Sequence, residues 1–240
     1  MRKTLFVLLG CATLFTYWAC NKNSNAVGPA NSLPSSSNDY FPLAVGDQWT
    51  YHIWSDSDGV KTPGSDATGP EGIVNDTTIG GRLAYGIGVP GYGSAFSYFA
   101  LDAQGNLLQF SNIGIGQTGG EWVHYTDFSN TVVGHTENLL ISGGSFVDTM
   151  GGLHDTIRVA DTMTETYMGE VTVTVPAGTF NAVYYKDSLG TVGFYGLIEK
   201  YYAKDIGLIK QVSLDISGGI FSSPITTQGQ YEELVSYSLK

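Results

Sequence analysis

Cysteine is nearly absent from this sequence, and the little there is lies at one end. Of the 240 residues only Cys11 and Cys20 are cysteines, so the chain from Asn21 to Lys240 has none. An exported domain without cysteine has no disulfides to hold it and depends on its hydrophobic core. Hydrophobic residues make up 42% of the chain, which is enough for such a core and excludes disorder throughout.

Charge is also scarce, and positive charge most of all. Asp, Glu, Lys and Arg make up 14% of the residues, against roughly 25% in ordinary soluble domains. There are 11 Lys and Arg against 22 Asp and Glu, a formal net charge of −11. A chain this acidic is poorly suited to hold nucleic acid or an anionic membrane through its charge, so we expect no nucleic-acid partner.

Helix signals are missing as well. No long amphipathic run occurs, helix-forming residues are scarce, and Gly alone occupies 32 positions. Segments such as 170–175, 209–216 and 235–239 alternate apolar with polar residues, which is typical of strands with one dry and one solvated face. The sequence therefore predicts an all-β fold. We expect a single antiparallel domain over residues 40–240, an open or half-closed β-barrel or a sandwich, with at most a short helix.

Further strands and turns follow from the same patterns. The additional predicted strands are 48–54, 72–79, 83–89, 94–101, 106–110, 156–167, 182–187 and 192–203. The predicted turns are Asp58-Gly59, Pro63-Gly64, Gly80-Gly81, Pro90-Gly91, Gly119-Gly120, Gly143-Gly144 and Gly218-Gly219. The stretch 117–153 is rich in Gly and Ser and alternates weakly, so we expect a long loop or insertion there.

The first nineteen residues have the pattern of an export signal. Arg2 and Lys3 give a cationic start, and residues 4–19 are uncharged and mostly apolar. As a helix, these sixteen residues would rise about 24 Å, short of the roughly 30 Å core of a bilayer. An export signal is therefore favoured over a permanent transmembrane helix.

A cysteine and a polar stretch follow this apolar run. Cys20 comes directly after Ala19, and residues 21–39 read NKNSNAVGPANSLPSSSND. This order resembles a bacterial lipoprotein signal. The resemblance implies a signal peptide over residues 1–19, cleavage before Cys20, lipidation of Cys20, and a disordered linker over the rest of 20–39. The lipid would anchor the protein to a membrane and leave the domain in water.

The residue after the lipidated cysteine bears on the location. Asn21, rather than Asp, favours the outer membrane of the cell envelope, and the face of that membrane is left open. Two alternatives remain for the signal itself. One is lipidation at Cys11, which follows Leu8-Leu9-Gly10, and the other is an ordinary secretory signal.

Three segments together resemble a known family. They read YFPLAVGDQWTY at 40–51, VTVTVPAGTFNAVY at 171–184 and YYAKDIGLIKQ at 201–211. In this order and spacing they are similar to segments of the TapB-like proteins, a group of exported bacterial envelope proteins with a domain of unknown function. The resemblance implies an antiparallel, open or half-closed β-barrel in the envelope, and it carries no catalytic residue. In the first segment, Trp49 and Tyr51 share one strand face, where they can plug an open end of the barrel.

No catalytic motif stands out. The sequence has no G-x-S-x-G elbow, and its four histidines have no metal-ligand spacing. We therefore predict no enzyme activity, no catalytic residue, no cofactor and no metal. The alternative is an extracytoplasmic hydrolase that uses acids and histidines of the 121–155 region, if this stretch folds back on itself. The residues concerned are Glu121, His124, Asp127, His135, His154 and Asp155.

Two other groups of acids are weaker candidates. Asp161 with Glu165 or Glu170 has the residue types of a glycosidase carboxylate pair, although strand surfaces carry such acids routinely. Asp56-Ser57-Asp58-Gly59 begins like a calcium loop but lacks the closing Glu. Neither group changes the prediction.

Aromatic residues are the best candidates for ligand contact. A barrel too wide for its side chains to fill encloses a cavity, and aromatic rings suit either a sugar or an apolar ligand. The candidates are Trp49, Tyr51, Phe96, Tyr98 and Trp122, for which core packing is the simpler interpretation. We predict a non-enzymatic binding or assembly module whose ligand is a small apolar molecule or a glycan. A purely structural or adhesive surface protein is the remaining alternative.

Overall fold

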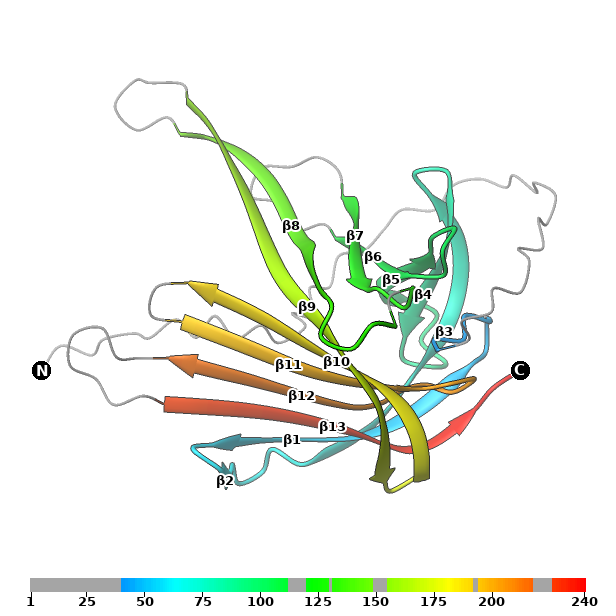
Figure 1. The fold of residues 1–240 in the computed structure, drawn as a ribbon. Helices are drawn as coiled ribbons and strands as arrows, with labels where there is room; N and C mark the ends of the chain where they lie inside the picture. The colour runs from blue at the N-terminus through cyan, green and yellow to red at the C-terminus, as the bar shows by residue number, and fades with distance from the viewer. Residues whose placement is uncertain (1–39, 112–119, 130, 149–154, 192–193, 218–225) are drawn as a thin grey trace, which may run out of the picture. The chain divides into compact units, whose positions relative to one another are not determined.

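Thirteen strands and no helix make up the described part of the chain in the computed structural model (Figure 1). That part comprises residues 40–111, 120–129, 131–148, 155–191, 194–217 and 226–240. The strands are β1 (Gln48–Ser57), β2 (Val60–Lys61), β3 (Ala67–Ile79), β4 (Arg82–Gly88), β5 (Ala95–Leu101), β6 (Leu107–Ser111), β7 (Glu121–Thr126), β8 (Thr136–Asp148), β9 (Asp155–Val175), β10 (Gly178–Thr191), β11 (Phe194–Ala203), β12 (Gly207–Ser217) and β13 (Thr226–Ser238). The all-β prediction is confirmed. Across these residues, no helix has the length and apolar character to cross a membrane.

All strands belong to one antiparallel sheet, so the sandwich alternative is wrong. Its order is β7-β6-β5-β4-β3-β1-β13-β12-β11-β10-β9-β8, with β2 paired to β1 alone. The order consists of two meanders, one of β3 to β7 and one of β8 to β13, and β1 joins them by pairing with both β3 and β13. The first strand therefore lies in the middle of the sheet.

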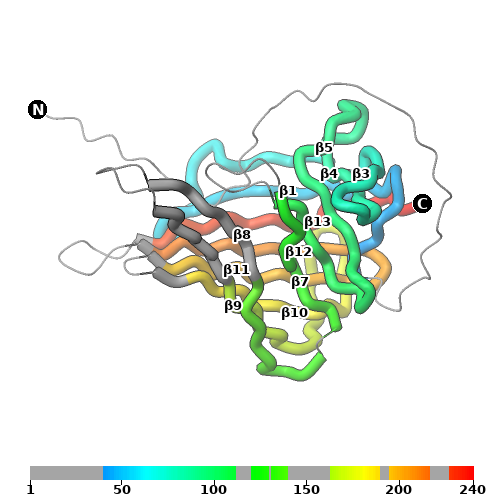
Figure 2. The backbone as a smooth tube through the Cα atoms, turned by 90° about the horizontal axis from the view of Figure 1, so that it is seen from above, coloured from blue at the N-terminus to red at the C-terminus, as the bar shows by residue number. Residues whose placement is uncertain are grey.

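The sheet curls into a nearly closed barrel whose seam lies between β7 and β8 (Figures 1 and 2). No ladder joins these two strands among the described residues. The end of β7 instead meets the inner face of β9 to β11 through side chains. The backbone N–H of Asp127 donates to Glu165 on β9 at 2.8 Å, and Lys200 on β11 donates to the carbonyl of Tyr125 at 2.7 Å. The half-closed barrel predicted from the sequence is therefore confirmed, with its opening at a seam.

The expectation of a long loop over 117–153 is wrong. Strands β7 and β8 lie within this stretch, and Gly143-Gly144 pairs with Val159 and Ala160 inside the β8 ladder instead of forming a turn. The long partner strand β9 fixes β8 along its whole length, which the weak local pattern could not reveal. The turns predicted at 58–59, 63–64, 80–81 and 90–91 are confirmed. Gly119 and the turn predicted at 218–219 lie outside the described residues.

Strand β9 is longer than predicted because a bulge joins two predicted strands. The segments 156–167 and 170–175 both belong to it, and its pairing with β10 shifts where Tyr167 and Gly169 face Tyr185 and Tyr184. Gly169 has a φ of 105°, a left-handed conformation that suits glycine. The extra residue bends the strand without ending it.

Aromatic rings fill the barrel near the first described residues. Phe41 lies 5.8 to 6.3 Å from the rings of Phe99, Trp49 and Tyr202. Phe128, which follows β7, packs edge-on to Tyr202 at 5.0 Å. Trp49 and Tyr202 are both buried. At this level side chains occupy the barrel interior.

The segments 40–51, 171–184 and 201–211 meet at this end of the barrel. The indole of Trp49 donates to the carbonyl of Ile206 at 2.6 Å, and the hydroxyl of Tyr51 donates to the carbonyl of Leu208 at 2.9 Å. Between those carbonyls, Gly207 has a φ of 106° beside the Trp49 ring, so a turn can start β12 there. In the segment 171–184, Ala177 donates its N–H to the carbonyl of Leu234 on β13. Structural contacts therefore account for these motifs.

Candidate functional site

The five aromatic residues predicted to contact a ligand do not share one surface. Trp49 and Tyr51 are buried, and their polar atoms bond to the backbone, so in this structure both belong to the core. Trp122 is half-buried and donates to the carbonyl of Ile79 at 3.2 Å. Tyr98 is half-buried, and Phe96 is exposed on β5. Ligand contact by any of the five stays a prediction.

The residues considered for a hydrolase are spread over the sheet. Glu121 and His124 are three positions apart on β7, so their side chains point to opposite faces. Asp155 begins β9, ten residues before Glu165, which is about 33 Å along an extended strand. His154 lies outside the described residues.

Two members of the hydrolase set do come together. Asp127 and His135 line a hollow of about 10 Å³ with Glu165, which is room for about one water molecule. Asp127 accepts hydrogen bonds from Ser129, and the His135 ring lies 3.3 Å from Glu137. The five described residues of this set therefore do not form one site, while the hydrolase hypothesis stays untested.

The other groups of acids are used within the fold. Asp56 accepts a hydrogen bond from the hydroxyl of Tyr231, and Asp58 accepts one from the N–H of Thr227. Glu165 is buried against Lys200, whereas Glu170 is exposed. The Asp161 side chain lies outside the described part of the structure.

A buried ionic cluster is the most concentrated chemistry in the described structure. Lys200 on β11 is 1% exposed, and its Nζ lies 2.7 Å from Glu165 Oε2 and 2.8 Å from Asp187 Oδ2. The same Nζ donates to the Thr126 hydroxyl at 2.8 Å, which in turn lies 3.1 Å from the hydroxyl of Tyr202. The cluster thus ties β9, β10 and β11 to the end of β7 and holds the barrel across its seam.

Strand register brings these charges together. Glu165 and Asp187 face each other directly across β9 and β10, and Lys200 faces Tyr185, two positions from Asp187. All of them therefore point to the inner face of the sheet. The sequence analysis did not predict this cluster, although the alternation pattern of the three strands contains a sign of it. In the predicted strands each charged residue occupies the same face as apolar or aromatic residues. Lys200, for example, is two positions before Tyr202.

The two carboxylates share one cation in a water-poor place. Burial raises the pKa of Asp187 to about 7; Lys200 opposes the rise and the Glu165 carboxylate adds to it. Burial alone would lower the pKa of Lys200, but the two carboxylates hold it well above its ordinary value. Asp187 Oδ2 is close enough to Lys200 Nζ to form an ion pair, but the two atoms lack hydrogen-bond geometry. Asp187 Oδ1 has no hydrogen-bond partner among the described residues. The cluster is therefore a structural tie in which burial favours the protonated form of Asp187 and Lys200 favours the ionised form.

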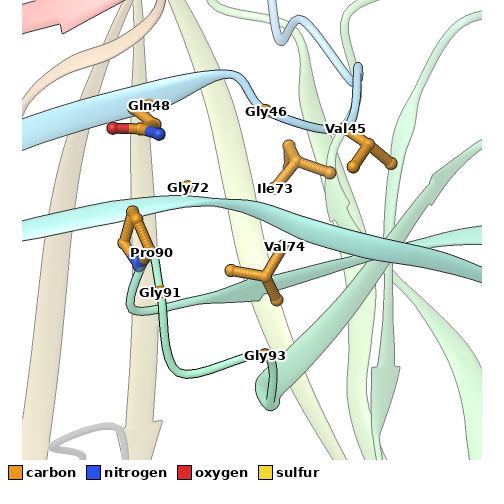
Figure 3. Close-up of a pocket in the computed structure, with 9 residues that line it drawn as sticks. All are labelled: Val45, Gly46, Gln48, Gly72, Ile73, Val74, Pro90, Gly91 and Gly93. Carbon is orange, nitrogen blue, oxygen red and sulfur yellow. The ribbon is translucent and has the colours of Figure 1, made fainter.

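A hollow of about 270 Å³ opens beside the start of β1 (Figure 3). It is lined by Val45, Gly46, Gln48, Gly72, Ile73, Val74, Pro90, Gly91 and Gly93. Four of these nine residues are glycines, and Gln48 is the one polar side chain among them. Gly72 is required by close packing, because a Cβ there would lie 2.6 Å from the carbonyl oxygen of Asp47. The lining is therefore mostly aliphatic carbon and bare backbone.

An exposed tyrosine stands next to this hollow. Tyr92 lies between Gly91 and Gly93 in the β4–β5 turn and is 78% exposed. Both glycines have positive φ, of 89° and 68°, which fixes the shape of the turn. The sequence marked Pro90-Gly91 as a turn but gave no sign that the turn would border a hollow with residues 45–48.

Comparison with known proteins adds little about function. No protein family and no curated protein matches this chain. Two solved structures resemble it at low identity. One is described as a lipoprotein of Parabacteroides distasonis and is 12% identical, with a TM-score of 0.39 over 84% of this chain and 99% of that chain. The other is an exported protein with a YmcC-like fold from Bacteroides fragilis, 16% identical, with a TM-score of 0.42 over 84% of this chain and 100% of that chain. At these identities and scores the likeness says nothing about what this chain binds or does.

Proposed function

We propose that this protein is a cell-envelope lipoprotein, anchored in the outer membrane through Cys20, whose β-barrel is a non-enzymatic binding module for an apolar ligand. The hollow beside β1 is the observation that carries the binding role. At about 270 Å³ it is close to the lower end of the range of small-molecule pockets, roughly 300 Å³. The ligand is therefore a small molecule or the end of a chain.

The lining favours an apolar ligand over a glycan. Sugar recognition requires several hydrogen-bonding side chains, because each buried hydroxyl needs a partner. Here Gln48 is the single polar side chain, and the rest of the wall is aliphatic or glycine. The aromatic side chains predicted to contact a ligand are either buried or distributed over other strands.

The N-terminal sequence supports the envelope location. A cationic start, an apolar run, Cys20 and a polar stretch stand in the order of a lipoprotein signal. The motifs at 40–51, 171–184 and 201–211, which resemble TapB-like proteins, support the same location. The absence of cysteine from the barrel is compatible with an oxidising compartment.

Replacing Cys20 by Ser is expected to release the protein from membranes. Acyl chains bury many methylene groups in the bilayer, and without them the domain has no comparable hold. The measurement is the distribution of the protein between membrane and soluble fractions of the bacterial cell, with Cys11→Ser as the matched control. Retention of Cys20→Ser in the membrane, together with release of Cys11→Ser, would assign the anchor to the other cysteine.

Native mass spectrometry tests the apolar ligand. Mature Cys20→Ser protein made in a bacterial periplasm is expected to carry a discrete added mass that disappears on denaturation. Val45→Asp should abolish it, because a carboxylate at the wall opposes an apolar ligand. Val60→Asp is the control, since Val60 is 71% exposed in the hairpin at the other end of β1.

The outcomes separate the hypotheses. An added mass that survives Val45→Asp would place the ligand elsewhere in the protein. A clean mass in all three proteins would contradict the binding role and favour the structural or adhesive alternative.

A further inference from the structure

The chain enters the barrel at a defined end. Residues 40–47 cross this end, from Tyr40, which stacks on Phe128 at 5.7 Å, to Gly46, whose N–H donates to the carbonyl of Ile73 on β3. The last residue lies beside them, because the N–H of Lys240 donates to Asp47 at 2.9 Å. Figures 1 and 2 show the first described residues and the C-terminus side by side. We call this the entry end of the barrel.

Exposed apolar side chains lie on both sides of the entry end. On the β1 side, Val45 is 42% exposed beside the hollow, and Tyr92 projects from the turn that borders it. On the β9 side, Val133 and Met168 are exposed. A series of ring contacts from Tyr40 through Phe128 and Tyr185 reaches Tyr167, the neighbour of Met168.

The position of the lipid anchor makes these exposed side chains relevant to membrane contact. Scattered exposed apolar residues are ordinary on soluble proteins. Here they stand where the linker joins the barrel, and the nineteen residues between Cys20 and Tyr40 allow these two residues to be at most about 70 Å apart. A tethered surface meets its membrane at a high effective concentration, so weak contacts suffice.

We infer that the entry end rests on the membrane surface, with Tyr92 and Val45 at the lipid interface and the hollow open toward the lipid. This inference rests on the proposed lipid anchor and names the partner of the same site. Tyrosine suits such an interface, because its ring is apolar and its hydroxyl stays in water. The net charge of −11 disfavours an anionic surface, so the matching lipid is zwitterionic. The apolar ligand then enters the hollow from the membrane.

Site-specific fluorescence tests this arrangement in the lipidated protein. The mature chain has no cysteine besides Cys20, and an acylated Cys20 does not react with a thiol dye. Tyr92→Cys therefore carries a single environment-sensitive probe, and Val60→Cys is the matched control, similarly exposed at the opposite end of β1. Both proteins are placed in phosphatidylcholine vesicles with and without brominated lipid.

The expected result is a blue-shifted emission and strong quenching by brominated lipid at position 92, with neither effect at position 60. Equal quenching at the two positions, or quenching at position 60 alone, would overturn the inference. So would a probe at position 92 that reports water while the protein stays on the vesicles. If the unsubstituted protein itself reacts with the dye and fails to sediment with vesicles, the lipid anchor is refuted, and the inference that rests on it falls as well.

Discussion

Replacing Lys200 by Met is expected to cost about 3–5 kcal/mol of the unfolding free energy at neutral pH. The substitution leaves Glu165 and Asp187 facing each other inside the barrel without a cation. Two buried like charges either repel or must take up a proton. Urea denaturation of mature Cys20→Ser protein measures the loss.

A half-exposed ion pair provides the control for this prediction. Lys210 lies 2.8 Å from Glu233, and the two side chains are 28% and 19% exposed. Because solvent screens this pair, Lys210→Met should cost at most about 1 kcal/mol. Equal losses for Lys200→Met and Lys210→Met would show that the buried cluster does not hold the barrel.

A third variant keeps the prediction testable if Lys200→Met fails to fold. Adding Glu165→Gln and Asp187→Asn removes the uncompensated charges and should recover part of the lost stability. Continued failure of this triple variant would shift the explanation from charge to packing around Tyr202 and Thr126, which contact the lysine position.

Stability is also expected to fall as the pH rises from 5 to 8.5. Burial, with the nearby charge of Glu71, raises the pKa of Glu232 to about 8, and burial raises that of Asp187 to about 7. Both values exceed those of the unfolded chain, near 4, so the folded state binds these protons more tightly. Their contribution is fully present below about pH 4 and is lost as the pH passes through 7 to 8.

The unfolding free energy should fall by at least about 1.4 kcal/mol, which corresponds to one pKa unit. A loss at least that large should appear between urea denaturation curves at pH 5 and pH 8.5. Glu232→Gln should flatten the profile, because it removes a titrating group that faces Glu71 and Tyr51. Glu233→Gln, one position along the strand and paired with Lys210, should leave the slope unchanged. A stability that rises over this range would contradict the expected pKa directions.

Local patterns were sufficient wherever a strand has one buried face. Local patterns located β1, β12 and, through residues 235–239, the last part of β13, and dipeptides such as Asp58-Gly59 located their turns, because both signals depend on neighbouring residues. The same logic failed at β8, whose Gly143-Gly144 is held in a ladder by its partner β9. A strand that is held mainly by pairing with its neighbour shows only a weak alternation pattern in its own sequence.

The candidate site illustrates the same limit. Val45, Gly72 and Gly91 come from three separate segments, and only the pairing of β1 with β3 and of β3 with β4 makes them neighbours. No spacing rule connects them. The sequence lists the aromatic residues, but only the structure shows that Tyr92 is exposed beside the hollow and that Trp49 is buried in the core.

The sequence by itself determined that this is an all-β chain without disulfides in its barrel, and it predicts export and a lipid anchor. These conclusions rest on composition and on contiguous segments, whose properties do not depend on contacts with distant parts of the chain. The tertiary structure decided that the sheet is single, that its seam is held by Lys200 between Glu165 and Asp187, and where the hollow lies. Such features depend on strand register, because a shift of one residue would turn every one of these side chains to the opposite face.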